Sequence, residues 1–413
     1  MGKPKPANKK KSKREKSILN GVGGVVSKPK MAESSTELLE KATILLQTGQ
    51  ADAALPLAQR ALEVSAGNSL EALSAINLIG EIYIELGEID AARNEFLKAV
   101  QIDPEGTIPE SQGGGAEKFL WLAQLSEQGG IDSVSWYEKG VRTLRQAIQS
   151  LEQSNRLEDA AALEEKRRKL ANALCAVVEI YMTDLSWEED AERRCESLVT
   201  EALLVAPDSP ECLQTLASVR ISQLRIDEAR AALSRSLELW KDLPPEDPKV
   251  PDFPARISLS RLLMEVEMEL EALQVLERLI LEDDQSVEAW YLGGWCLYLL
   301  SQKEPDASAT NAESGEKPED KRHESMVASR AWLKQSLKLY DKIEYEDVRL
   351  KEHAVELVQE LTEKLGGNDA DDDDDESDAF GFGEGDGDDD EWEDEIEGGS
   401  DEDEDDDHEM KDS

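Results

Sequence analysis

The middle of the chain repeats a helix-pair pattern, and this repetition limits the fold more than any other feature of the sequence. The clearest copy runs from Leu73 to about Gln101 and stops at Pro104. Apolar residues recur three and four positions apart on both sides of Gly87, which predicts two amphipathic helices joined by a turn. The residues that let such a pair pack closely are the small Gly80 and Ala92 and the ring side chains Tyr83 and Phe96.

The pattern resembles the tetratricopeptide repeat at nearly every signature position. Further copies fit around 38–62, 213–237 and 259–280, and another opens at Trp290. Two helix pairs, over 116–153 and 159–206, depart from the template. The resemblance implies an all-α fold: a right-handed superhelical solenoid of about seven helix pairs, because each pair can bury its apolar face only against its neighbours.

The boundaries of the array follow from composition. A polar stretch at 301–324 predicts a mobile insertion in the last helix pair, and 344–365 has the pattern of a capping helix with a polar outer face. We therefore expect a solenoid over 35–365. It would lie between a disordered basic segment, 1–34, and a disordered acidic tail, 366–413.

Charge is distributed unevenly along the 413 residues, whose formal net charge is −46. Residues 1–30 carry ten Lys or Arg against one Glu, whereas 366–413 carry 27 Asp or Glu against one Lys. The remaining 31–365 have a net charge of −29. Body and tail would repel nucleic acid and attract a basic protein.

The first helix of each pair lines the inner groove of a tetratricopeptide array, and the template assigns groove-facing positions to it. Carboxylates recur at these positions, and an aromatic cluster occupies them in the last pair. Carboxylates complement Lys and Arg, and rings stack on guanidinium planes. An alternative is that the aromatic residues pack on the capping helix. The predicted partner-binding residues are Glu81, Glu85, Glu179, Glu265, Glu288, Tyr291, Trp295 and Tyr298.

The two ends suggest separate roles. The basic run Lys3–Lys16, with its core at Lys9–Lys16, is typical of a nuclear localisation signal that binds importin. Two less favoured alternatives are a phosphate-contacting arm and a segment that binds the acidic tail of the same chain. In the tail, Phe380, Phe382 and Trp392 interrupt the acidic residues, a pattern suited to weak anchoring on a basic partner or to solubility alone.

No pattern for reaction chemistry, cofactor binding or membrane insertion is found. Four cysteines without CxxC spacing fall in apolar helical patterns, where a thiol is usually a small buried hydrophobe. The tail run Asp386, Asp388 and Asp390 fails as an EF-hand because Glu391 stands where the loop needs Gly. We expect a monomeric protein that is not an enzyme, holds no metal or cofactor, binds no nucleic acid directly and does not enter a membrane.

A basic start, a repeat array with an acidic groove and an acidic, aromatic-dotted tail together resemble the fungal dedicated assembly chaperones of large-subunit ribosomal protein four. The resemblance implies capture of that protein as a basic client, shuttling between cytoplasm and nucleus, and delivery to pre-60S assembly. A nuclear histone chaperone remains an alternative, because acidic tails suit histones too. A second alternative is an adaptor subunit of a larger complex.

Overall fold

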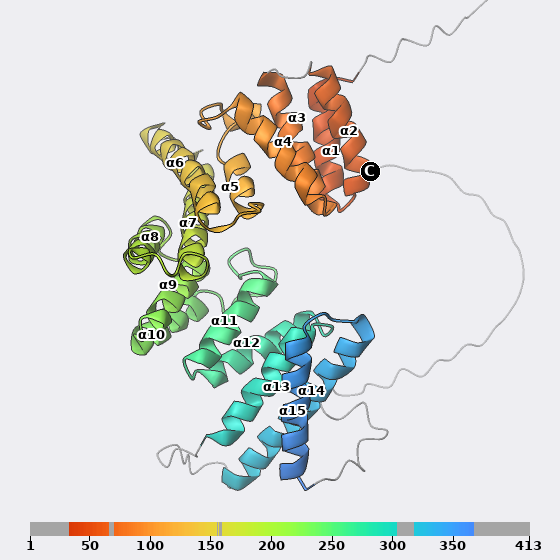
Figure 1. Ribbon diagram of the computed structural model, residues 1–413, viewed down its shortest axis with the longest axis vertical. Coiled ribbons are helices and arrows are strands. Elements are labelled where there is room, and N and C mark those ends of the chain that lie inside the picture. Colours follow the sequence, from red (N-terminus) through yellow and green to blue (C-terminus); the bar gives the residue numbers. More distant parts are fainter. Residues whose placement is uncertain (1–32, 66–69, 155, 157–158, 304–317, 367–413) are drawn as a thin grey trace, which may run out of the picture. The chain divides into compact units, whose positions relative to one another are not determined.

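The computed structural model describes residues 33–65, 70–154, 156, 159–303 and 318–366 (Figure 1). All but two residues of the expected basic segment, most of the insertion, and all of the acidic tail except Gly366 lie outside the described residues. Within them all regular structure is helical, which agrees with the all-α prediction. No helix in these ranges is both long and apolar enough to cross a membrane.

Seven helix pairs and a final single helix follow one another along the described chain, as the repeat pattern predicts. The pairs are α1 (Ser35–Gln47) with α2 (Ala51–Val64), α3 (Leu73–Glu85) with α4 (Ile89–Ile102), α5 (Glu117–Gln124) with α6 (Gly130–Ser154), α7 (Ala160–Met182) with α8 (Ala191–Val205), α9 (Pro210–Ser222) with α10 (Ile226–Glu238), α11 (Phe253–Glu265) with α12 (Glu269–Glu282), and α13 (Val287–Gln302) with α14 (Pro318–Ile343). The single helix is α15 (Val348–Lys364), at the predicted position of the cap.

Local chemistry explains where the helices begin and turn. Ser34 and Glu37 form a reciprocal capping box at the start of α1. The turns of the first two pairs place Gly49 and Gly87 at φ of 71° and 74°, in the left-handed region that glycine enters without steric cost. Ser209 caps α9 through the backbone N–H of Cys212.

The chain divides within α12 into two compact units, one up to Val275 and one from Leu276. In the first unit the pair α3–α4 packs as the sequence predicts. A Cβ atom on Gly80 would lie 2.7 Å from the ring of Phe96, so a larger residue would force the helices apart. Phe96 is 1% exposed, and Trp121 of the next pair stacks on it at 6.2 Å between ring centroids.

The second unit joins α13, α14 and α15 in one bundle. Gly293 and Gly294 let α14 approach closely, because added Cβ atoms would meet Trp332 and Leu333.

The insertion predicted at 301–324 is shorter than expected: α13 continues to Gln302 and α14 begins at Pro318. Proline and acidic residues are favoured in the first turn of a helix, which explains a start within the polar stretch.

All four cysteines are free and buried, as expected for small hydrophobes. Cys175 of α7 and Cys212 of α9 lie with their sulfur atoms 3.5 Å apart. Burial raises the pKa of the Cys195 thiol above its ordinary value, so this side chain stays protonated. The Cys195 thiol therefore contributes apolar packing.

Candidate functional site

A cavity of about 350 Å³ lies on the first helices of three successive pairs, α7, α9 and α11, and we call it the central cavity. Its lining residues recur at spacings of three and four along each helix, so each helix presents one face to it. These spacings match the groove-facing template positions. The central cavity is lined by Asn172, Cys175, Ala176, Glu179, Met182, Glu211, Gln214, Thr215, Ser218, Ala255, Ser258 and Leu262.

Two carboxylates and one buried amide give the central cavity its chemistry. Loss of hydration raises the pKa of Glu179 above that of a free glutamate. Glu211 accepts a hydrogen bond of 2.9 Å from the hydroxyl of Ser209. Gln214 is 7% exposed, and its side-chain nitrogen has no hydrogen-bond partner among the described residues. A ligand with a cationic group and a carbonyl oxygen would pair with the carboxylates and accept a hydrogen bond from the Gln214 amide.

A second cavity of about 350 Å³, the N-terminal cavity, lies between α1, α3, α5 and α7 and the loop before α5. Glu81 lines it from α3. Burial raises the pKa of Glu81, the carboxylate of Glu117 raises it further, and Lys169 opposes both. The amide nitrogen of Asn77 donates a 2.6 Å hydrogen bond to the Gly113 carbonyl, while its side-chain oxygen is buried without a partner in the described ranges.

Two lysines of α7 make the N-terminal cavity less acidic than the sequence pattern predicts. Lys166 reaches Glu110 at 2.6 Å, and Lys169 pairs with Glu117 and, at 2.9 Å, with Glu165. The first-helix template does not place these lysines in the groove, because they lie on the N-terminal extension that makes α7 longer than a standard first helix. A cationic client segment therefore meets freer carboxylates in the central cavity than here.

The other two carboxylates predicted in the first unit, Glu85 and Glu265, are exposed at the last residues of α3 and α11. Neither lines a cavity described above. Glu265 lies one turn beyond Leu262, which does line the central cavity. Glu85 lies one turn beyond Glu81, which lines the N-terminal cavity. Each of the two exposed carboxylates is therefore one turn away from a cavity-lining residue of its own helix.

The aromatic residues predicted in the second unit pack on α15. The hydroxyl of Tyr291 lies 2.7 Å from Nδ1 of His353, and Tyr298 donates a 2.7 Å hydrogen bond to Glu360. Trp295 meets the His353 ring edge-on at 5.1 Å between centroids. This is the packing alternative that the sequence left open. Glu288 is half-buried at the start of α13.

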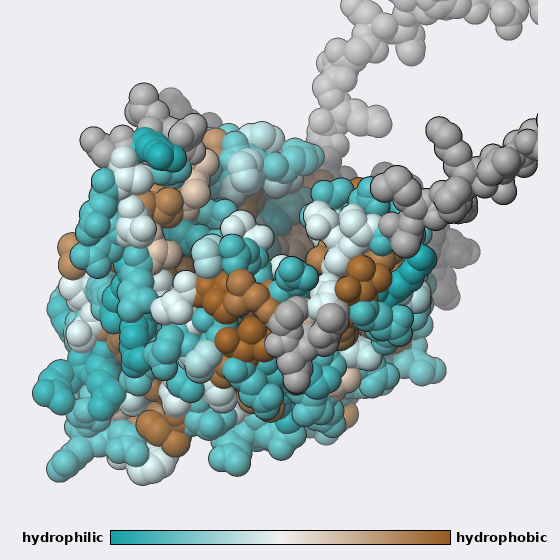
Figure 2. Space-filling view, turned by 90° about the horizontal axis from the view of Figure 1, so that it is seen from above, coloured by the Kyte–Doolittle hydropathy of each residue, from teal (hydrophilic) through white to brown (hydrophobic). Residues whose placement is uncertain are grey.

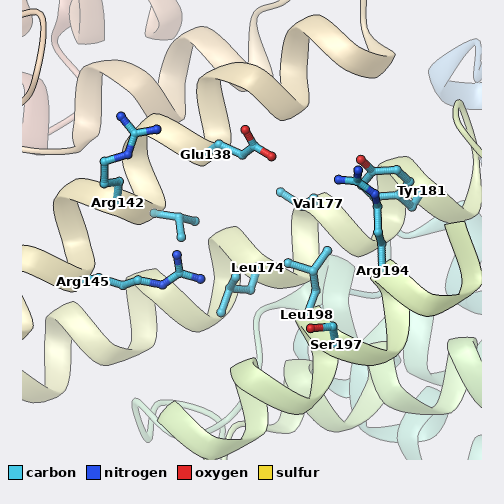
Figure 3. Close-up of a pocket in the computed structure, with 10 residues that line it drawn as sticks. Glu138, Arg142, Arg145, Leu174, Val177, Tyr181, Arg194, Ser197 and Leu198 are labelled. Atoms are coloured by element: carbon cyan, nitrogen blue, oxygen red, sulfur yellow. The ribbon is translucent and has the colours of Figure 1, made fainter. Parts of the chain in front are cut away.

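A third cavity, of about 370 Å³, lies between α6, α7 and α8 and has a different character (Figure 3). Arg142, Arg145 and Arg194 surround apolar side chains. Arg145 forms a two-pronged pair with Glu201 at 2.9 and 2.8 Å, and Arg194 bonds Asp190 at 2.7 Å. Arg142 pairs more loosely with Glu105, at 4.0 Å, so all three cations have a neighbouring carboxylate.

Sequence reasoning missed Glu211 and Gln214 in the central cavity. The signal was present: the three template positions that give Asn172, Cys175 and Glu179 in α7 give Glu211, Gln214 and Ser218 in α9 when counted from Pro210. Applying the template to every pair would have found them.

Comparisons with known proteins agree with the repeat fold and identify relatives of the chain. The tetratricopeptide repeat profile matches residues 34–105. A protein of Emericella nidulans named "Probable assembly chaperone of rpl4" is 64% identical over 374 residues, covering 90% of this chain and 93% of the relative. A Schizosaccharomyces pombe protein of the same name is 36% identical over 338 residues, covering 82% of this chain and 92% of the relative.

A solved structure gives the same result. The protein described as "Assembly Chaperone of RpL4 (Acl4) (Residues 1-338)" superposes with a TM-score of 0.63 at 57% identity, covering 67% of this chain and all of the other. Two relatives share more than 30% identity over most of both chains, and the fold agrees. The chain therefore belongs to the tetratricopeptide-repeat family of rpl4 assembly chaperones.

Proposed function

We propose that this protein is a dedicated chaperone of rpl4 that holds a basic, extended segment of its client against the first helices of the array. The central cavity carries the proposal. It combines Glu179, Glu211 and the unpartnered amide of Gln214 on one open face. Carboxylates attract Lys and Arg, and the amide can bond to the client backbone whatever its sequence. Names of close relatives support rpl4 as the client.

The same electrostatics explain holding and release without catalysis. A net charge of −46 disfavours contact with RNA and favours a strongly basic client. Ribosomal RNA carries a denser negative charge, so it competes for the same lysines and arginines once the client reaches the pre-60S particle. A single copy of the chain, with no direct nucleic-acid contact, suffices for this exchange.

In this proposal the basic N-terminal segment binds importin and so directs the protein to the nucleus. Deleting residues 1–16, which hold eight of the ten basic residues before position 31, removes the proposed importin site. The truncated protein is expected to stay in the cytoplasm, as measured by fluorescence microscopy of a tagged chain, while its client affinity is unchanged. Unchanged nuclear distribution would remove the importin assignment and leave the client proposal intact.

Affinity purification of the tagged full chain from cells tests the client. We expect one basic large-subunit ribosomal protein, rpl4, in about equal amount, and binding that weakens as salt rises to ~0.5 M because surface charges are screened. Core histones in its place would favour the histone-chaperone alternative. Binding that is insensitive to salt would favour an adaptor in a larger complex.

A further inference from the structure

In five successive pairs, from α3–α4 to α11–α12, one large apolar residue is exposed where the chain passes from the first helix to the second, either in the turn or at the first or second residue of the second helix. All five are in the first unit, and their exposures range from 41% to 85%. On the face seen in Figure 2 most residues are hydrophilic, and the hydrophobic ones form small groups. Exposed apolar residues that recur at the same place in successive pairs therefore indicate an interaction surface. The five residues are Ile89, Ile131, Trp187, Leu224 and Leu270.

Side-chain contacts join the first three of these turns to one another. Arg93, at the start of α4, donates a 2.8 Å hydrogen bond to the carbonyl of Leu125, where α5 ends. The backbone N–H of Gly130, beside Ile131, donates at 3.0 Å to Asp184 in the turn of the next pair, three residues before Trp187.

The remaining turns are linked in the same way. Gln223, beside Leu224, donates at 3.1 Å to Glu192 at the start of α8. Arg230 of α10 donates at 2.8 Å to the carbonyl of Val266, where α11 ends. The five turns therefore form one continuous surface, which we call the turn edge: residues 86–90, 125–132, 183–190, 223–228 and 266–271.

Two of the apolar residues on the turn edge are placed in ways that packing within the chain does not explain. Leu224 is 85% exposed and has φ of 58°, in the left-handed region where Gly49 and Gly87 stand in the first two pairs. A β-carbon there costs about 1 kcal/mol. The indole N–H of Trp187 donates to the Asp184 carbonyl at 2.9 Å, so the ring has its polar atom satisfied and its apolar face in water.

The charge of the turn edge indicates the partner. Its five segments contain 13 Asp or Glu and one basic residue, Arg225. Arginines pair with six of these carboxylates, and a seventh, Glu269, is buried. The edge thus keeps an excess of negative charge after this pairing. The six paired carboxylates are Asp90, Glu127, Asp190, Asp227, Glu228 and Glu267. We propose that the turn edge is a second docking surface for the basic client, and that it binds a segment in which apolar side chains alternate with Lys or Arg. This inference rests on the proposed function.

The test compares two full-length variants for binding to purified rpl4. One carries Ile131→Ser, Trp187→Ser and Leu224→Gly on the turn edge. The matched control carries Val64→Ser and Leu204→Ser, which are similarly exposed near the opposite ends of second helices. We expect about tenfold weaker binding for the first variant, since a few apolar anchors usually dominate an interface, and no change for the control. Equal affinity of the two variants would overturn the inference.

Hydrogen exchange of the full chain distinguishes loss of binding at the turn edge from loss of binding at the central cavity. It also shows whether the turn edge binds something other than rpl4. We expect rpl4 to protect amides at 183–190 and 223–228 in the wild-type chain but not in the edge variant, whose central cavity remains protected. If rpl4 protects neither region, the proposed function fails as well.

Two other outcomes concern what occupies the turn edge. Protection that is already present in the free chain and is lost on deleting residues 1–32 would assign the edge to the chain's own basic segment. Self-association that the edge variant abolishes would assign it to a second copy. Either outcome overturns the inference.

Discussion

Replacing Glu179 and Glu211 with lysine together is expected to lower the affinity for rpl4 by about 100-fold, or ~2.7 kcal/mol. Both side chains line the central cavity, and neither approaches a described cation there as Lys169 approaches Glu117 in the N-terminal cavity. The change removes two attractive charges and places two repulsive ones against a cationic segment. Isothermal titration calorimetry of the full-length variant with purified rpl4 measures the loss.

The matched control is Glu63→Lys with Glu238→Lys, which makes the same change in net charge on the second helices α2 and α10. Long-range attraction alone would weaken both variants equally, and a specific groove weakens only the first. Equal losses, or no loss in either variant, would count against the central cavity as the client site.

Acidification offers an independent check on the same groups. The pKa values of Glu179 and Glu81 are raised by loss of hydration, so these carboxyls take up protons at a higher pH than exposed glutamates. A bound cation favours the charged form. Client binding should therefore release protons, and affinity should fall as the pH drops toward these raised pKa values.

Replacing Asp103 with alanine is expected to lower the free energy of unfolding by about 3–5 kcal/mol. Asp103 and Lys118 are 2% and 1% exposed and form an ion pair of 2.8 Å. Lys118 also donates at 2.7 Å to the Gly115 carbonyl, and Asp103 accepts from the backbone N–H of Thr107 at 2.9 Å. The substitution leaves a buried ammonium without its counter-charge and frees the loop that borders the N-terminal cavity.

The pH dependence of this variant follows from the lysine. Burial lowers the pKa of Lys118 below its ordinary 10.5, and Asp103 opposes that shift. Without Asp103 the folded protein holds this proton more weakly than the unfolded chain does. Stability of the variant should then rise with pH until about 10.5, where the unfolded lysine also loses its proton.

Urea denaturation of the full chain measures the loss, with the double variant Asp103→Ala, Lys118→Met as its control. Removing both charges leaves no unpaired buried group, so the double variant should recover most of the stability. A single variant within about 0.5 kcal/mol of the wild type would show that Lys118 finds other partners.

The sequence predicts which side chains line the groove where this depends only on the spacing of residues along a single helix. Glu179 and Met182 line the central cavity where the template places them, because spacing along a helix fixes which side chains share a face. The lysines of the N-terminal cavity were not predictable in this way. Lys166 and Lys169 enter it because α7 extends beyond the repeat length and crosses toward α3 and α5, and no local pattern encodes that contact.

The aromatic cluster shows the same limit. The sequence placed Tyr291, Trp295 and Tyr298 on one face of α13 but left open whether that face meets a client or α15. Only the folded second unit decides between them, by bringing His353 and Glu360 of α15 within hydrogen-bond distance of the two tyrosines.

The sequence by itself determined the seven helix pairs, the capping helix, the sign of the charge and the family, since these depend on periodicity, turn residues and composition within short windows. The tertiary structure alone decided which carboxylates remain available in the groove, how the Asp103–Lys118 pair is buried, and that five turns join into one edge. Each of these depends on distances between residues far apart in the chain, which close packing fixes and local pattern does not.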